Sequence, residues 1–335
     1  MLVNSKFPFK MNAHKLTNNM TYNYLFKDIF IGISLCLLIF ILTLSLPLFG
    51  FFIALVLPQP VLFFRLKLGK KMGAIIPITV LLIITIVMHG LLADVFFYGS
   101  LLLMGFLIGN FIEQHLSIEK TILYTFLTTI GIGLSLFILY SFSTERSIFI
   151  IISDYVAKNI ELSFRIYSEI GIDQEKIDAL AKSSELIQHI IIRIMPSMFT
   201  TMLIFVSWLN IIIIKRILIK DNVVMSWLGI LNHWKAPDYL VWFAIFTVAS
   251  IFISVESIKI IGLNIFIILM LIYFFQGISI VSFFFEKKKL PLFLRFFIYT
   301  LIIIQQIFAI LIIGLGFFDT WFDFRKLNLK QNLQN

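Results

Sequence analysis

The stretch ERSIFIIISDYVAKNIELSFRIYSEIGIDQEKIDALAKSSELIQHIIIR, residues 145–193, is the only long polar run in the chain. It holds eight acidic and six basic side chains, although charged residues make up only 13% of the sequence. Five apolar segments precede it and four follow it. We therefore expect the run to lie outside a membrane that the flanking segments cross.

Apolar residues recur at helical spacing within this run. The first set predicts an amphipathic helix and consists of Ile148, Ile152, Tyr155, Leu162 and Ile166. Gly171 is expected to end that helix, and the Asp173 carboxylate to cap a second one that leads into the next apolar segment. This pattern predicts a helical hairpin on the membrane surface. It is either packed on its own protein or used as a lid or a docking site for a partner.

Composition excludes an ordinary soluble domain. The chain is 60% hydrophobic with a mean hydropathy of +1.01, whereas soluble domains are about 45–50% apolar. The single cysteine, Cys36, cannot form an intramolecular disulfide. The predicted fold is an all-α polytopic transmembrane helical bundle.

The chain is predicted to have five parts. They are a basic arm over residues 1–28, five spans within 29–144, the hairpin at 145–193, four spans within 194–318 and a polar tail over 319–335. The second span is interrupted by Leu57-Pro58-Gln59-Pro60, which predicts a kink or a re-entrant segment. Eight spans therefore remain an alternative to nine. The last span, residues 290–318, is long enough to cross with a tilt.

Lysine and arginine positions predict the orientation. With the N-terminus in the cytoplasm, the arm, the basic turn at 65–71 and the connectors after spans four, six and eight all face inward. This side is then strongly positive and the other slightly negative, which accounts for the net charge of +9 without a nucleic-acid partner. With nine spans the polar tail would lie outside.

Signals for chemistry are scarce. Gly69-Lys70-Lys71 lacks the remaining residues of a phosphate-binding P-loop, and the five histidines have no metal-ligand or haem-attachment spacing. No nucleophile or pair of acids can be assigned, so we expect neither an enzyme nor a bound cofactor. Acidic residues fall near span ends, which disfavours a proton-driven pump.

Uncharged polar residues lie deeper in the predicted spans. They are Ser197, Thr200 and Thr201 on the sixth span, Gln276 and Ser279 on the eighth, and Gln305 on the ninth. An amide in hydrocarbon must be paired, so we expect these groups to face the bundle interior. They either join helices to one another or line a site for a small polar solute.

Three short elements resemble the YybS-like family of predicted bacterial membrane proteins. The first contains Trp234, Pro237 and Trp242; the second is Gln276-Gly277 after three aromatic residues; the third contains Asp319, Trp321, Asp323 and Arg325. Tryptophans in these elements also suit aromatic belts, and Asp323 and Arg325 also suit a solvated helix end.

The resemblance implies a bacterial inner-membrane protein of unknown function. It also implies distant similarity to the substrate-binding subunits of energy-coupling-factor vitamin transporters. Such subunits dock on a membrane partner through small residues of their first span, of which Gly32, Ser34 and Cys36 are a poor version here. Two hypotheses follow: a small-solute binding subunit without its own ATPase, whose ligand the sequence does not name, or an envelope assembly protein whose hairpin docks another membrane protein.

Overall fold

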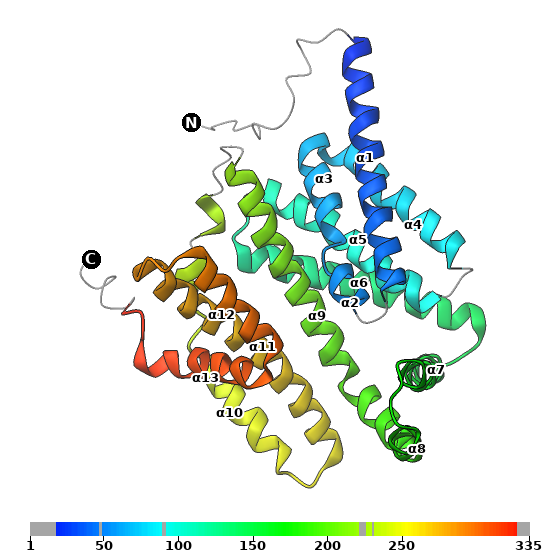
Figure 1. Ribbon diagram of the computed structural model, residues 1–335, viewed down its shortest axis with the longest axis vertical. Helices are drawn as coiled ribbons and strands as arrows, with labels where there is room; N and C mark the ends of the chain where they lie inside the picture. The colour runs from blue at the N-terminus through cyan, green and yellow to red at the C-terminus, as the bar shows by residue number, and fades with distance from the viewer. Residues whose placement is uncertain (1–17, 47–48, 89–91, 221–225, 230, 327–335) are drawn as a thin grey trace. The chain divides into compact units, whose positions relative to one another are not determined.

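The computed structural model describes residues 18–46, 49–88, 92–220, 226–229 and 231–326 (Figure 1). Most of the basic arm (residues 1–17) and most of the polar tail (residues 327–335) lie outside these ranges. The chain divides into two compact units, one of residues 1–158 with 203–228, the other of residues 159–202 with 229–335. The division falls within helices α7 and α9, and each unit is described below by itself.

The part of the chain that the structure describes is helical, as predicted. The N-terminal unit contains α1 (Asn18–Ser45), α2 (Gly50–Ala54), α3 (Pro58–Gly73), α4 (Ile75–Val87), α5 (Leu92–Glu113) and α6 (Ile118–Thr144). The polar run forms α7 (Ile148–Glu169) and α8 (Gln174–Lys182), and its last ten residues begin α9 (Ser184–Lys220). The C-terminal unit contains α10 (Leu240–Ile251), α11 (Glu256–Lys287), α12 (Leu292–Ile304) and α13 (Gln306–Phe322).

Fewer helices than expected are long enough to cross a bilayer. Six continuous segments of the described residues qualify by length and composition, or seven if α12 and α13 together count as one. With 13 and 12 residues, α4 and α10 reach about 20 Å and 18 Å, less than the roughly 30 Å of a hydrocarbon core. The predicted eight or nine full spans are therefore not confirmed.

The N-terminal unit is built on close contact between α3 and α5. A Cβ added at Gly105 would lie 2.4 Å from the Pro58 carbonyl oxygen, so only glycine permits this approach. The predicted interruption at Leu57–Pro60 is confirmed, because α2 ends at Ala54 and Pro58 begins α3, where its missing N–H is not needed. All four residues of the interruption are buried.

Two ion pairs join three helices of this unit. Lys67 Nζ lies 2.8 Å from Asp28 Oδ1, and Arg65 Nη2 lies 2.8 Å from Glu113 Oε2. Asp28 of α1, the basic turn in α3 and the last residue of α5 are therefore brought together. That the arm, the basic turn and the connector after the fourth span share one side of the membrane remains a prediction.

The C-terminal unit is centred on α11. Figure 1 shows α13 crossing it, and two glycines allow the backbones to touch. A Cβ at Gly277 would lie 2.0 Å from the Ile312 carbonyl oxygen, and one at Gly316 would lie 2.0 Å from the Tyr273 carbonyl oxygen. Val241 and Ala244 of α10 pack in one cluster with Leu269 and Tyr273 of α11.

The last predicted span is not a tilted straight helix. It breaks at Gln305 (φ −101°, ψ 109°), and α12 and α13 meet at an angle of 102°. This break brings the end of α13 back to the connector that precedes α10, because Arg325 donates to the carbonyl oxygens of Asn232 and Trp234. The nine-span prediction placed the connector and the tail on opposite sides, and this contact does not support it.

The polar run forms the two helices expected from its pattern. Gly171 has φ +80° and follows α7 closely, and the Asp173 carboxylate accepts from the Glu175 backbone N–H as the cap of α8. A packed hairpin and its position outside the bilayer remain predictions.

Candidate functional site: a buried polar network in the C-terminal unit

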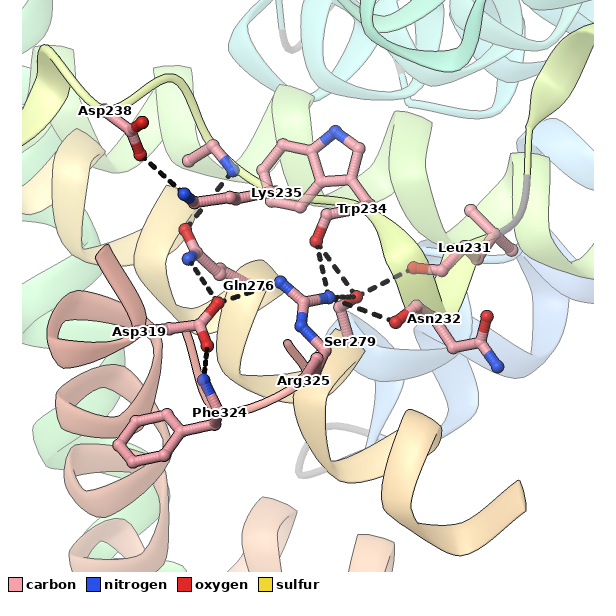
Figure 2. Close-up of polar contacts among 11 residues, drawn as sticks. Leu231, Asn232, Trp234, Lys235, Asp238, Gln276, Ser279, Asp319, Phe324 and Arg325 are labelled. Atoms are coloured by element: carbon pink, nitrogen blue, oxygen red, sulfur yellow. Dashed lines mark hydrogen bonds and ion pairs between the residues drawn. The ribbon is translucent and has the colours of Figure 1, made fainter. Parts of the chain in front are cut away.

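The connector before α10 is largely non-helical, yet it is packed among helices. Within residues 229–239 the structure describes one short 3₁₀ helix, η2 (Leu231–His233), followed by an irregular segment up to the start of α10. Irregular backbone exposes carbonyl and N–H groups that a helix would pair internally. Side chains from α11 and from the end of α13 supply the missing partners (Figure 2).

Gln276 and Ser279 of α11 hold the connector from one side. Gln276 Oε1 accepts from the Ala236 N–H at 3.3 Å. The Ser279 hydroxyl lies 2.9 Å from the Leu231 carbonyl oxygen and 3.1 Å from that of Trp234, so its single proton is donated to one of the two. Both α11 side chains are buried, as their depth in the predicted span led us to expect.

An Arg325–Asp319 ion pair closes the network from the other side. Arg325 Nη1 donates to the carbonyl oxygens of Asn232 (3.0 Å) and Trp234 (2.9 Å) and to Ser279 Oγ (2.8 Å). Arg325 Nη2 lies 2.9 Å from Asp319 Oδ2, and the two side chains are 0% and 1% exposed. The alternative interpretation of Arg325 as a solvated residue at a helix end is therefore wrong.

Asp319 links the arginine to α11. Its Oδ2 also accepts from Gln276 Nε2 at 3.0 Å, and its Oδ1 accepts from the Phe324 N–H at 2.9 Å. That last bond is possible because the chain turns at Asp323, which has φ 39°. Asp319 and Arg325 therefore belong to the folded unit and not to a polar tail beginning at residue 319.

The network lies deep along α11. The helix has 32 residues, about 48 Å, and Gln276 lies about 7 Å from its midpoint. If α11 is centred in a bilayer, Gln276 is inside the hydrocarbon core, where non-helical backbone is tolerated only when protein buries it or when it lines a cavity.

Some buried polar atoms around the network lack a partner within the described residues. They are the Tyr273 hydroxyl, Arg325 Nε and Asn232 Oδ1. Tyr273 is 1% exposed and lies one turn before Gln276, with its ring edge-on to Phe317 at 5.2 Å. A buried hydroxyl without a partner is unfavourable by about 1–3 kcal/mol, which makes this atom a candidate contact for a ligand or a water molecule.

The structure does not bring the residues of the predicted solute site together. Gln276 and Ser279 meet in the network, but Ser197 and Thr201 of α9 are satisfied elsewhere, since Ser197 Oγ donates to the Ile194 carbonyl and Thr201 Oγ1 to that of Ser197. Thr200 is half-buried on the same helix. Gln305 is exposed at the α12–α13 break, so its predicted interior position is wrong.

Ser197 has a second role, at the break that Pro196 makes in α9. Its backbone N–H donates to Asn264 Oδ1 at 2.9 Å, and Asn264 Nδ2 donates to the Arg193 carbonyl oxygen at 2.9 Å. A regular helix joins these two backbone groups directly. The Asn264 amide of α11 therefore pairs with the two backbone groups that are left without each other beside the proline.

The family-like residues separate into two groups. Trp234, Gln276, Asp319 and Arg325 are members of the network, and Gly277 permits the close α11–α13 contact. Trp242 and Trp321, by contrast, are 63% and 54% exposed, as residues of an aromatic belt would be, and Pro237 is exposed shortly before α10. Sequence analysis missed Tyr273 and Asn264; the one available signal was the position of Asn264 within an apolar segment.

A model of the DUF2232 family, described as a predicted membrane protein, matches residues 34–320. The chain belongs to this family. The match covers the network up to Asp319 and is consistent with the YybS-like resemblance. No curated protein and no solved structure matches the chain.

Similarity to energy-coupling-factor subunits is not confirmed. In this family member, two of the three small residues on α1 are already packed against other residues of the N-terminal unit. A Cβ at Gly32 would lie 2.6 Å from Ile76 Cδ1, and Cys36 is fully buried. Docking on a partner through this surface would require those contacts to open. Among the described residues, no group of three or more metal-binding side chains is present.

Proposed function

We propose that this DUF2232 protein is a membrane subunit that binds a small polar solute for transport and has no ATPase of its own. The observation that carries the proposal is the irregular connector, which charged and amide side chains hold beside the middle part of α11, an apolar helix of 32 residues. Interrupted helices with polar backbone at membrane depth are a recurring feature of transporter binding sites. In this proposal the chain binds and does not catalyse.

The solute is placed beside the Tyr273 hydroxyl. Gln276 and Ser279 already hydrogen-bond to the connector, and Asp319 to Gln276, Phe324 and Arg325, so in this proposal they position the connector and do not contact the solute first. The Tyr273 hydroxyl is the buried group one turn away that has no partner within the described residues.

Tyr273→Phe is therefore the variant that tests the proposal. It removes one oxygen that makes no hydrogen bond within the described residues, so the fold should remain at least as stable. Wild-type protein purified in mild detergent should retain a small molecule in native mass spectrometry, and Tyr273→Phe should lose it. Tyr239→Phe, the same change at a residue that is 61% exposed, is the matched control. Equal retention by Tyr273→Phe and wild type, or no retained solute in any preparation, would refute the proposal.

We further propose that the protein resides in the cytoplasmic membrane with the N-terminus on the cytoplasmic side, and that the connector before α10 and the residues after α13 reach the network from that side. The lysine and arginine distribution and the Arg325 contacts support this orientation. Single cysteines in a Cys36→Ala background test it with a membrane-impermeant thiol reagent on intact cells. Ser254→Cys, between α10 and α11, should react, whereas Lys288→Cys and Lys326→Cys should react only after lysis. Labelling of Lys288→Cys or Lys326→Cys on intact cells would contradict this orientation.

An assembly role is the second candidate, favoured by exposed apolar residues on α7. Phe149 and Leu162 are 66% and 42% exposed. If α7 docks another membrane protein, Phe149→Ser with Leu162→Ser should release a co-purifying partner without changing solute retention. A partner that stays bound would remove the support for this role.

A further inference from the structure

Arg65 is the largest fully buried charged side chain of the N-terminal unit. It belongs to the basic turn in α3, and its exposed fraction is 0%. Two glycines make room for its stem: a Cβ at Gly109 would lie 2.7 Å from Arg65 Cγ, and one at Gly73 would lie 2.8 Å from Arg65 Cα. The site is therefore built around this side chain from α3 and α5.

Only one of its three nitrogens has a partner in the part of the unit that the structure describes. Nη2 donates to Asn110 Oδ1 at 2.5 Å and to Glu113 Oε2 at 2.8 Å. Nε and Nη1 are buried without a hydrogen-bond acceptor, and the guanidinium carbon lies 5.4 Å from the centre of the Phe106 ring. Since Nε carries one N–H and Nη1 two, three strong donors are buried and unused.

The charges around Arg65 favour an anion as the missing acceptor. Glu113 balances Arg65, and Asp28 balances Lys67. Lys70 and Lys71 follow within six residues, are exposed, and leave the region with an excess of positive charge. Glu113 is the last residue of α5, a helix long and apolar enough to cross a bilayer, so the site is expected near the level of the headgroup phosphates.

We propose that Arg65 binds a phosphate oxyanion through Nε and Nη1, with Lys70 and Lys71 supplying additional positive charge. The phosphate belongs either to an anionic lipid headgroup or to a soluble phosphate compound. A planar guanidinium with free N–H groups is well suited to phosphate oxygens. This site lies in the N-terminal unit and does not depend on the solute site proposed above.

Access to Arg65 requires a local movement. Gly73 packs on the arginine, and the segment that leads to it begins at Gly69, which has φ 81° and ψ 178°, a conformation that interrupts α3. Glycine adopts this conformation without strain, so the backbone at Gly69 can turn. Movement of this segment would uncover the guanidinium and bring Lys70 and Lys71 to the same anion.

Arg65→Lys separates a specific site from general surface charge. It keeps the positive charge and an ammonium that can still pair with Glu113, but it removes the Nε and Nη1 donors. Lys67→Gln is the matched control, because it lowers the net charge by one while leaving Arg65 unchanged. Both proteins and the wild type are titrated in detergent with phosphatidylglycerol, phosphatidylcholine and inorganic phosphate, and binding is measured by native mass spectrometry and thermal unfolding.

Wild type should bind phosphatidylglycerol in preference to phosphatidylcholine, or inorganic phosphate by itself. Arg65→Lys should weaken this binding at least about tenfold, since each charge-assisted bond lost is expected to reduce affinity by that order. Lys67→Gln should change it by less. If inorganic phosphate competes with the lipid, the site is assigned to a soluble phosphate compound. If it does not compete, the site is assigned to the lipid headgroup. The proposal would be overturned if the wild type bound neither phosphatidylglycerol nor inorganic phosphate, a result that does not require any variant to fold. It would also be overturned if Lys67→Gln weakened binding more than Arg65→Lys does.

Discussion

Removing the negative charge of Asp319 should be among the most destabilising conservative substitutions in the C-terminal unit. In Asp319→Asn the side chain keeps its shape, but one carboxylate oxygen becomes an NH₂ group. Oδ1 faces the Phe324 N–H, and Oδ2 faces donors of Gln276 and Arg325, so either placement of the new amide opposes a donor to a donor. It also leaves Arg325 buried without its countercharge.

The expected loss of unfolding free energy is about 3–5 kcal/mol, the range for removing one partner of a buried ion pair. No reduction for solvent screening applies, because the two side chains are 1% exposed or less. Arg325→Gln should be similarly destabilising. The double variant should lose less than the two single variants together, by about 0.5–3 kcal/mol, since neither unpaired charge is then left.

Unfolding in mixed micelles of dodecyl maltoside and sodium dodecyl sulfate, followed by helical circular dichroism, measures these differences. Glu161→Gln is the control, because Glu161 and Arg165 form an ion pair on α7 with side chains 65% and 68% exposed. That change should shift stability by no more than about 0.5 kcal/mol. If Asp319→Asn unfolds like the control, the pair is not buried as described and the argument fails.

Two further predictions concern helix contacts and use the same titration. Gly277→Ala would place a methyl group 2.0 Å from the Ile312 carbonyl oxygen and should destabilise the protein by about 1–3 kcal/mol or more. Gly314 has nothing within 4 Å of an added Cβ, so Gly314→Ala should be neutral or stabilising by up to about 1 kcal/mol. Equal effects of the two changes would contradict the close α11–α13 contact. Asn264→Leu should lower the free energy of unfolding by about 1–3 kcal/mol in the wild type. In a Pro196→Ala background α9 can form its own backbone hydrogen bonds, so the same change should cost much less. An identical loss in both backgrounds would count against the bridging role of Asn264.

Local features were predicted well where they depend on neighbouring residues. The helix pattern of residues 148–166, the Asp173 cap and the interruption before Pro58 all follow from spacing and from backbone restrictions within a few residues. The close contact at Gly277 was not predicted, because the sequence gives no sign of which helix will lie against a glycine.

Long-range pairing could not be predicted from the sequence. Arg325 pairs with a side chain six residues away, but its other partners lie 46 positions earlier on α11 and more than ninety positions earlier in the connector. A polar residue near the end of an apolar segment has the same local pattern whether it is solvated or buried. The depth of Gln305 was misjudged for the same reason, since its exposure depends on a break that its apolar neighbours do not indicate.

The sequence by itself determined that this chain is an all-helical membrane protein of the DUF2232 family, because apolar length, charge placement and family similarity are all properties of the linear chain. The tertiary structure decided which polar groups meet, that the last apolar segment bends by 102°, and that its end returns to the connector before α10. The physical reason is that buried donors and acceptors must find partners, and those partners lie on helices far apart in the sequence.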